Sequence, residues 1–368
     1  MKTNIVVGAG ISGIVIANLL ATLRNEKVLI VDRRTNIGGN CYDYRDKNGI
    51  MVHKFGSHFF HTSNEKVWNY LKHFTDFNQY MHKVTAIIDG VETIVPFNLN
   101  SIHDIFPKAL AEKLEAKLLE NYGFGKKAPI LELRNSEDAD LKFLGEFVYD
   151  KVFLPNAVKQ YGQKAEDIDA GLAEDVYVYI SKDNRYSQDK YQGLPLDGYT
   201  AMLERMIMHP NIELRLGIDS KEVNAKFDRT FYTGSIDEYF NYEFGQLPYR
   251  SVVWKLEEHD KDYYQSNAVI DFPENYDFTR VHEYKHYLNE KSQRTVIAKE
   301  YAVSFELGRT ERAYPVQKTG AEIYQKYQEK AKSLKNVYFL GRLGDYKYYN
   351  MDEAVARAIE VFESIGKN

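Results

Sequence analysis

Three glycines near the N-terminus have the spacing of a dinucleotide-binding loop. Gly8, Gly10 and Gly13 lie in the stretch T-N-I-V-V-G-A-G-I-S-G. In such a loop the first glycine permits a tight turn, the second lets the backbone approach a pyrophosphate, and the third lets helix and strand pack closely. Asp32 ends the later stretch V-L-I-V-D, where a carboxylate would accept hydrogen bonds from ribose hydroxyls. These residues predict a bound dinucleotide rather than an ordinary glycine-rich turn.

A second glycine pair follows the acidic residue directly, in R-R-T-N-I-G-G-N. A glycine pair just beyond the ribose acid looks like the extended flavoprotein form of the motif, so it favours FAD over NAD. Arg33, Gly39 and Asn40 of this stretch are therefore further candidates for cofactor binding.

Apolar spacing indicates the elements that would position these residues. Residues 5–7 and 28–31 are short buried-strand patterns, and residues 11–23 have apolar positions spaced for one helix face, which predicts a βαβ unit. Residues 101–190 have a helical pattern. Residues 229–304 contain β-branched and aromatic runs, among them T-F-Y-T-G, S-V-V-W-K-L and N-A-V-I-D-F, which are typical of antiparallel strands.

The predicted fold class is therefore α/β, with a Rossmann-type FAD-binding domain, a helical domain and an antiparallel β-sheet domain. A chain of 368 residues exceeds the size at which single cores stop growing, so more than one domain is expected. The predicted boundaries are 1–95 with about 195–235 and 310–368 for the FAD-binding domain, 96–190 for the helical domain with a mobile substrate loop, and 236–309 for the antiparallel sheet domain.

Composition excludes several classes of partner. The net charge is −5 and like charges do not cluster, so nucleic-acid binding is not expected. Cys41 is the single cysteine, which excludes an internal disulfide and suits a reducing cytoplasm. The sequence has no run of about 18 apolar residues, so it predicts neither a membrane span nor a membrane partner. The expected localisation is cytoplasmic.

One histidine-rich stretch, H-K-F-G-S-H-F-F-H-T at residues 53–62, resembles the bacterial UDP-galactopyranose mutases. Further similar motifs run in order along nearly the whole chain: P-F-N-L-N, Y-Q-G-L-P, Y-R-S, N-A-V-I-D-F, T-R-V-H-E-Y-K-H, Y-P-V and G-R-L-G-D-Y-K-Y-Y. The resemblance implies a homodimeric flavoenzyme that interconverts the pyranose and furanose forms of a nucleotide sugar and supplies furanose for surface polysaccharide. It also implies that FAD must be reduced, because flavin N5 attacks the anomeric carbon and forms a flavin–sugar adduct, although the net reaction is redox-neutral.

The resemblance also assigns roles to individual residues. Arg280 matches an arginine that holds the diphosphate, His58 a histidine at the flavin ring, and Arg342 an arginine near the flavin. The catalytic residues implied are His58, Arg280, Tyr314 and Tyr348. The substrate-binding residues implied are Phe153, Asn156, Tyr161, Asp175, Tyr186, Asn267, Arg280, Tyr314, Tyr348 and Asn350. His58 and His61 have the H-x-x-H spacing of a metal pair, but no third ligand stands near in the sequence, so no metal is expected.

The sequence departs from the family pattern in the substrate loop. Where the family reads approximately G-Y-T-x-K-Q-W-G, this chain reads L-P-N-A-V-K-Q-Y-G, so Asn156 replaces a tyrosine and Tyr161 a tryptophan. Asp175 falls where the family has an arginine that pairs with the position of Arg280. Reversing a charge this close to a phosphate changes an interaction of roughly 1 to 4 kcal/mol, depending on the effective dielectric. Asn350 replaces a family aspartate.

Three interpretations of this departure remain open. In the first, Lys182, Arg185 or Lys190 takes over the diphosphate and UDP-galactose remains the substrate. In the second, the sugar nucleotide has changed: a carboxylate such as Asp175 suits the adjacent N–H donors of guanine, which implies a GDP-sugar. A dTDP-sugar or a UDP-N-acetyl sugar is a further possibility. In the third, the chain binds FAD without catalysing the mutase reaction. An amine-oxidase type of oxidoreductase would share the glycine loop but lack the sugar-nucleotide residues.

Overall fold

The structure is a computed structural model that describes residues 1–168, 170–174 and 176–365. The chain forms two compact units. Unit 1 comprises Met1–Tyr80, Asp189–Ser251 and Phe305–Asn368, and unit 2 comprises Met81–Gln188 and Val252–Ser304.

Unit 1 contains a parallel sheet with the strand order β11-β2-β1-β12-β18. The apolar runs of β1 and β2 are buried on both faces, as expected for inner strands of a parallel sheet. Val7, the last residue of β1, pairs with Val31 on one side and Tyr232 on the other, so the carboxyl ends of these strands meet at Gly8. The strands are β1 (Thr3–Val7), β2 (Lys27–Asp32), β11 (Ile212–Leu216), β12 (Arg229–Tyr232) and β18 (Val337–Phe339).

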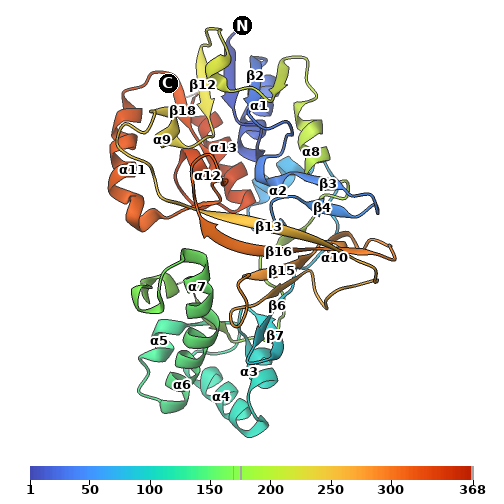
Figure 1. Cartoon of the computed structure of the whole chain (residues 1–368), viewed down its shortest axis with the longest axis vertical. Coiled ribbons are helices and arrows are strands. Elements are labelled where there is room, and N and C mark those ends of the chain that lie inside the picture. Colours follow the sequence, from blue (N-terminus) through green and yellow to red (C-terminus); the bar gives the residue numbers. More distant parts are fainter. Residues whose placement is uncertain (169, 175, 366–368) are drawn as a thin grey trace. The chain divides into compact units, whose positions relative to one another are not determined.

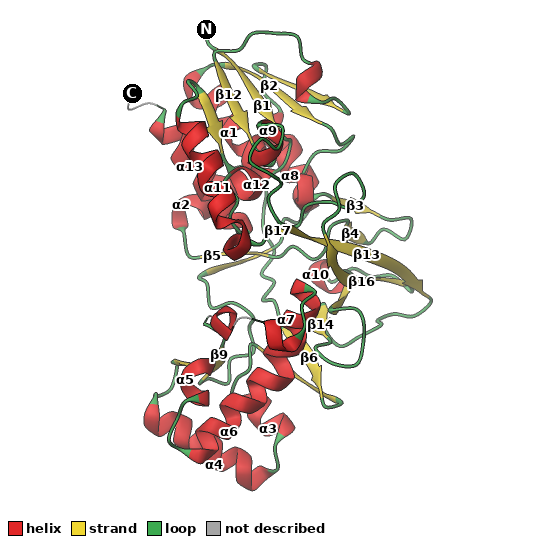
Figure 2. Ribbon diagram, turned by 60° about the vertical axis from the view of Figure 1, so that its left-hand side comes forward, coloured by secondary structure: helices red, strands yellow, loops and turns green. Residues whose placement is uncertain are grey.

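Helix α1 (Ile11–Arg24) connects β1 to β2 and is buried along most of its length. It ends at Asn25, whose left-handed backbone closes the last turn. Helix α13 (Met351–Ser364) packs against α1 (Figure 2). The other elements of unit 1 are η1 (Gly39–Cys41), β3 (Asp43–Arg45), β4 (Met51–His53), β5 (Phe60–Thr62), α2 (Glu65–Leu71), β10 (Tyr191–Gly193), α8 (Gly198–Ile207), η5 (Ser220–Glu222), α9 (Ile236–Tyr239), β17 (Tyr314–Pro315), α11 (Gln317–Lys332) and α12 (Gly341–Gly344).

Unit 2 contains a largely antiparallel sheet with the order β13-β16-β15-β14-β6-β7. Within it β14 and β15 form a hairpin in which Asp271 lies opposite Arg280. β14 pairs with β6 in parallel. The strands are β6 (Val84–Ile88), β7 (Val91–Val95), β13 (Tyr249–His259), β14 (Val269–Asp271), β15 (Arg280–Glu283) and β16 (Thr295–Ser304). The first three residues of β13 belong to unit 1, where Tyr249 and Arg250 pair with β17.

Most helices of unit 2 follow β7 along the chain (Figure 1, teal to green). They are α3 (Leu99–Ile105), α4 (Lys108–Asn121), α5 (Ile130–Arg134), α6 (Ala139–Val148), the π-helical turn η2 (Tyr149–Phe153), α7 (Leu154–Tyr161), η3 (Ala165–Asp167), η4 (Ala170–Ala173) and, later, α10 (Lys285–Leu288), with the short strands β8 (Lys127–Pro129) and β9 (Tyr177–Tyr179). Among the described residues, no helix is both long and apolar enough to cross a membrane.

The predicted α/β fold, with its parallel βαβ unit, helical segment and antiparallel sheet, is confirmed. One strand was predicted with the wrong direction: the T-F-Y run in β12 pairs in parallel with β1 and β18. Residue propensity could not show this, because β-branched and aromatic residues favour strands of either direction. The helical segment and the antiparallel sheet lie in one compact unit, and their division into two domains stays a prediction.

Candidate active site

The first and third glycines of the N-terminal loop are required by close packing. Gly8 has a φ of 108°, and a Cβ built on it would lie 2.0 Å from Oγ1 of Thr233. A Cβ on Gly13 would lie 2.0 Å from the carbonyl oxygen of Gly8. Both positions therefore hold the start of α1 tightly against β1 and β12, as their spacing predicts.

Gly10 has a different environment. A Cβ built on it would have Gly39 Cα, 3.7 Å away, as its nearest neighbour, so the protein itself leaves room there. Gly10 is the N-cap of α1, no side chain caps the helix, and its first turn carries no acidic residue. The N-terminus of α1 thus presents backbone N–H groups and the positive end of the helix dipole to the cavity that Gly10 and Ser12 line. This cradle fits the pyrophosphate of a dinucleotide.

The second glycine pair packs against the first loop. The Gly38 N–H donates to the Ala9 carbonyl over 2.8 Å, and a Cβ on Gly39 would lie 2.9 Å from Gly10 Cα. The R-R-T-N-I-G-G-N stretch therefore helps to build the same cradle.

Asp32 lies at the end of β2, as predicted, and faces the cavity. Its two carboxylate oxygens accept hydrogen bonds from the backbone N–H groups of Ala9 (2.7 Å) and Arg34 (2.8 Å). These bonds fix the carboxylate, and each oxygen retains the capacity to accept another hydrogen bond, as a ribose would require.

The cavity has a volume of about 970 Å³ and is lined by residues of unit 1. This volume is at the upper end of the usual range for cofactor sites. Of the residues predicted to bind the cofactor, those that line it are Gly8, Gly10, Asp32, Arg33, Gly39, Asn40, His58 and Arg342, whereas Gly13 packs behind the loop. The Arg33 guanidinium is held by Glu238 at 2.6 Å, and Asn40 accepts hydrogen bonds from Arg34.

His58 lies on the wall of this cavity in a fixed tautomer. Its Nδ1 is 2.7 Å from the Gly56 carbonyl oxygen, which can only accept, so Nδ1 carries the proton and Nε2 is an acceptor. Burial lowers the pKa of His58 to about 3, and the neighbouring His53 contributes to this effect. His58 is therefore neutral at physiological pH and can accept a hydrogen bond but not supply a charge.

Arg342 fixes the segment that carries Tyr348. Its guanidinium donates to the carbonyl oxygens of Ala313 (3.1 Å) and Tyr349 (2.7 Å) and lies over the Tyr348 ring at 4.5 Å. Tyr348 itself is half exposed. Arg342 thus lines the cavity with its side chain while it holds a predicted substrate tyrosine in place.

Two further predicted residues of unit 1 have defined positions. Tyr314 lies in β17, opposite Arg250. Asn350 is the N-cap of α13, lines the cavity, and donates its backbone N–H to the Glu353 carboxylate over 2.8 Å. The H-x-x-H pair is divided between separate partners, since His61 contacts Asp189 at 2.6 Å whereas His58 contacts Gly56.

In unit 2, Arg280 lies beside two acidic residues. Its Nε lies 3.0 Å from Oδ1 of Asp271 and 4.0 Å from Oε2 of Glu300. Burial raises the pKa of Asp271, and the adjacent Arg280 offsets this only in part. Burial also opposes ionisation of Glu300, but Arg280 and hydrogen bonds from His282 and Thr279 lower its pKa to about 2. Arg280 is thus held against carboxylates along one edge of its guanidinium.

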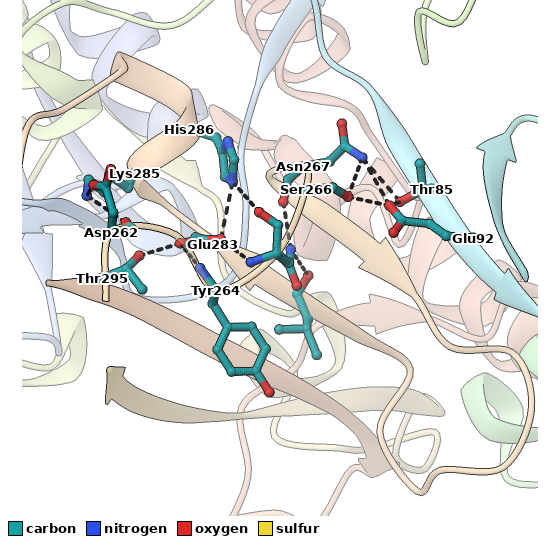
Figure 3. Close-up of polar contacts among 12 residues, drawn as sticks. Thr85, Glu92, Asp262, Tyr264, Ser266, Asn267, Glu283, Lys285, His286 and Thr295 are labelled. Atoms are coloured by element: carbon teal, nitrogen blue, oxygen red, sulfur yellow. Dashed lines mark hydrogen bonds and ion pairs between the residues drawn. The ribbon is translucent and has the colours of Figure 1, made fainter. Parts of the chain in front are cut away.

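The remaining predicted substrate residues lie at several places in unit 2. Phe153 ends the π-helical turn η2, and α7 carries Asn156 and Tyr161. Tyr186 is exposed and contacts the His82 ring at 5.7 Å. The Asn267 amide donates to Ser266 Oγ (3.0 Å) and, more weakly, to Thr85 and Glu92 (Figure 3). Asp175 lies outside the described residues.

The cations suggested as replacements in the diphosphate site have other contacts. Arg185 donates to both carboxylate oxygens of Asp183, at 3.0 and 2.9 Å from Nε. Lys182 lies 3.4 Å from Glu115, and Lys190 lies over the Tyr191 ring at 4.7 Å.

Comparison with known proteins identifies the family. A family model described as UDP-galactopyranose mutase matches residues 151–348, and one described as an NAD(P)-binding Rossmann-like domain matches residues 6–74. The chain is 36% identical to a dTDP-fucopyranose mutase from Escherichia coli, over 100% of this chain and 99% of the relative. It is 34% identical to a probable UDP-galactopyranose mutase from Klebsiella pneumoniae, over 98% of this chain and 93% of the relative.

The chain belongs to the UDP-galactopyranose mutase family. The fold agrees, because a crystal structure of reduced UDP-galactopyranose mutase matches with a TM-score of 0.72 at 14% identity, covering 100% of this chain and 94% of that one. This UDP-galactopyranose mutase family member is therefore a mutase acting on a nucleotide sugar, and its cofactor is FAD. The predicted family, enzyme class and cofactor are confirmed.

Sequence reasoning missed four residues of this mutase that the structure places beside predicted ones. Thr233 contacts Gly8, and Asp271 and Glu300 face Arg280. Lys159 lies in α7 beside Asn156 and Tyr161 and donates to the carbonyl oxygen of Phe272. The signal for Asp271 was the acid that ends the apolar run N-A-V-I-D, and the signal for Lys159 was its match to the lysine of the family loop pattern. Thr233 and Glu300 gave no signal, because their partners are distant in the sequence.

Proposed function

We propose that this mutase interconverts the pyranose and furanose forms of a pyrimidine nucleoside diphosphate sugar, in the manner of UDP-galactopyranose mutase. The observation that carries the proposal is similarity over almost the whole chain to mutases named for UDP-galactopyranose and dTDP-fucopyranose. Uracil and thymine differ by one methyl group, so both relatives point to the same class of nucleotide. The product would be a furanose donor for surface polysaccharide, made in the cytoplasm by a homodimer.

Arg280 is the residue proposed to bind the diphosphate. A planar guanidinium can bind two phosphate oxygens at once, and Asp271 holds this one along its Nε edge. Negative charge grows on the diphosphate as it leaves the anomeric carbon, so a fixed cation stabilises that transition state more than the ground state. Tyr314, Tyr348 and Tyr186 are also proposed to bind the substrate, through hydroxyl groups that can donate hydrogen bonds.

The reduced flavin would supply a nucleophilic nitrogen toward the anomeric carbon. The chain would hold the cofactor through the α1 N-terminus, Asp32 and the second glycine pair. His58, kept neutral with Nε2 as an acceptor, would orient a hydrogen-bond donor of the flavin or the sugar without adding charge. Arg342 would contribute positive charge on the cavity wall.

The nucleobase would lie against α7, where Asn156 offers an amide and Tyr161 a ring. An amide can pair with the carbonyl and imide groups that uracil and thymine share. Phe153, at the end of the adjoining π-helical turn, would contribute a further aromatic surface. Asn267 and Asn350 are proposed to contact the substrate as well.

Within this class a dTDP-sugar is the alternative to a UDP-sugar, and it is supported by the 36% identity to the dTDP-fucopyranose mutase. A GDP-sugar or a UDP-N-acetyl sugar would be a different substrate for the same reaction. A protein that binds FAD without turnover, or an FAD oxidoreductase, would be a different function.

A product panel tests the proposal. The FAD-loaded protein is reduced with dithionite and incubated with UDP-galactopyranose, dTDP-fucopyranose, UDP-N-acetylgalactosamine and a GDP-hexose, and furanose products are quantified by chromatography and NMR. We expect furanose from a uridine or thymidine substrate and almost none from oxidised protein. Arg280→Ala should abolish turnover, whereas the matched control Arg294→Ala, at an exposed arginine on Asp260, should not. Turnover that needs oxidised flavin and an electron acceptor would refute the proposal.

A further inference from the structure

Lys159 connects α7 to the hairpin that carries Arg280. Its Nζ lies 2.5 Å from the carbonyl oxygen of Phe272 and 3.2 Å from that of Phe278. Lys159 lies in α7 three residues after Asn156 and two before Tyr161. One ammonium group therefore joins the proposed nucleobase helix to the β14–β15 hairpin.

The two carbonyl groups belong to opposite sides of the turn in that hairpin. Phe272 follows the last residue of β14 and Phe278 lies two residues before β15. The turn is closed by a hydrogen bond of 2.8 Å from the Phe272 N–H to the Thr279 carbonyl. Directly behind it, Asp271 lies opposite Arg280 in register. An anchor at this turn thus fixes the backbone next to both residues.

The environment of Lys159 strengthens these bonds. Lys159 is partly buried, and this burial lowers its pKa even though the nearby carboxylates of Asp277 and Glu274 act in the opposite direction. Hydrogen bonds from a cationic donor are stronger than neutral ones, and reduced competition from water strengthens them further. The aromatic rings of Phe272 and Phe278 pack edge to face at 5.0 Å, which stiffens the acceptor side.

A nucleoside diphosphate has two recognition elements separated by a ribose, and a site gains affinity when the groups that bind them are held at the matching distance. We propose that Lys159 is a positioning residue that sets the distance between α7 and Arg280, and so favours ligands that carry both a base and a diphosphate. This inference rests on the proposed function, and it adds a residue that does not itself contact the nucleotide.

A positioning role and general structural support predict different binding data. A positioning residue affects the affinity for a whole nucleotide more than the affinity for pyrophosphate, whereas structural damage lowers both. Dissociation constants of UDP, dTDP and inorganic pyrophosphate are measured by titration calorimetry on the FAD-loaded full chain. The variants are Lys159→Met, which keeps the unbranched apolar stem without the ammonium group, Lys159→Arg, which retains cationic donors, and the control Lys164→Met at an exposed lysine of the next segment.

We expect Lys159→Met to raise the Kd of UDP or dTDP by about tenfold or more, because one to two charge-assisted hydrogen bonds that hold α7 on the hairpin are lost. The Kd of pyrophosphate should change less than about twofold. Lys159→Arg should restore nucleotide affinity to within about threefold of wild type. Lys164→Met should bind all three ligands as wild type does. Flavin absorbance should be the same in every variant, because the cofactor cavity is lined by residues of unit 1.

Equal nucleotide affinity in Lys159→Met and wild type would overturn the inference. So would an equal loss for pyrophosphate and nucleotides, since that result would show general damage to the Arg280 region. Binding of neither UDP nor dTDP by the wild-type protein would overturn the proposed function instead, and the inference with it.

Discussion

Substitution of Gly10 by alanine should separate cofactor binding from folding. Gly10 has φ −82° and ψ 178°, which alanine adopts without strain, and the added methyl group would meet its nearest protein atom at 3.7 Å, an ordinary contact distance. Alanine restricts the unfolded chain but is a poorer N-cap than glycine, so these effects offset each other and the unfolding free energy of the FAD-free protein should change by less than about 1 kcal/mol. The same methyl group would occupy the cradle where a pyrophosphate approaches the α1 N-terminus. We expect FAD affinity to fall by more than about tenfold, which is 1.4 kcal/mol.

Gly13→Ala is the matched comparison with a larger effect on stability. Its methyl group would lie 2.0 Å from the Gly8 carbonyl oxygen and 3.1 Å from Val6 Cγ1. The first contact is a steric clash with the backbone, which would have to move to relieve it. Overpacking of this kind costs about 1 to 3 kcal/mol or more, so Gly13→Ala should destabilise the FAD-free protein.

Both effects are measurable on one set of proteins. Urea denaturation of the FAD-free forms gives the unfolding free energies, and quenching of flavin fluorescence gives the FAD dissociation constants. The reasoning is refuted if Gly10→Ala binds FAD within twofold of wild type, or if it destabilises the FAD-free protein as much as Gly13→Ala does.

Three further predictions concern other parts of the chain. Burial holds the pKa of His58 at about 3 in the folded chain, against 6.5 when unfolded, so the unfolded state binds this proton first and stability falls as the pH drops from 6.5 toward 3. His58→Gln should therefore reduce the loss of unfolding free energy between pH 7 and pH 4, measured by urea denaturation. An unchanged pH dependence would contradict the assignment. Lys285 is fully buried and donates to Asp262 (Figure 3) and to the carbonyl oxygen of Ser292. Lys285→Met should therefore cost about 1 to 3 kcal/mol in unfolding free energy while exposed Lys291→Met costs almost nothing, and equal values would contradict this. In Arg280→Lys, a single ammonium group cannot keep the Asp271 contacts and also donate to a diphosphate, so the Kd of UDP measured by calorimetry should rise by about tenfold or more. Wild-type affinity in this variant would show that Arg280 does not bind the diphosphate.

Sequence reasoning succeeded where neighbouring residues determine the structure. The glycine spacing, the apolar runs on either side of it and the acid at the end of β2 are all within the first 32 residues, and a βαβ unit fixes how they meet. The cradle could therefore be predicted before the fold was known. The resemblance added Arg280 and His58 as candidates, because their motifs are also continuous in the sequence.

The remaining features depend on contacts between distant segments. Thr233 meets Gly8 only because β12 lies beside β1, and the parallel direction of β12 is set by its place in the sheet rather than by its residues. The Asp271–Arg280 pair depends on hairpin register, and Lys159 reaches two backbone carbonyls, which carry no sequence signal. Charge neutralisation around Arg280 and the tautomer of His58 were likewise visible only in three dimensions.

The cofactor unit is assembled from three separated stretches of chain, and this order affects how the protein is made. When the ribosome has completed the glycine loop, β1 still lacks its neighbour β12, which is translated some 220 residues later, and α1 lacks α13, which is translated near residue 350. Unit 2 has most of its residues available earlier. A nascent chain should therefore be able to form most of unit 2 before it can capture FAD, and flavin loading should be a late step that follows synthesis of residues beyond Phe305.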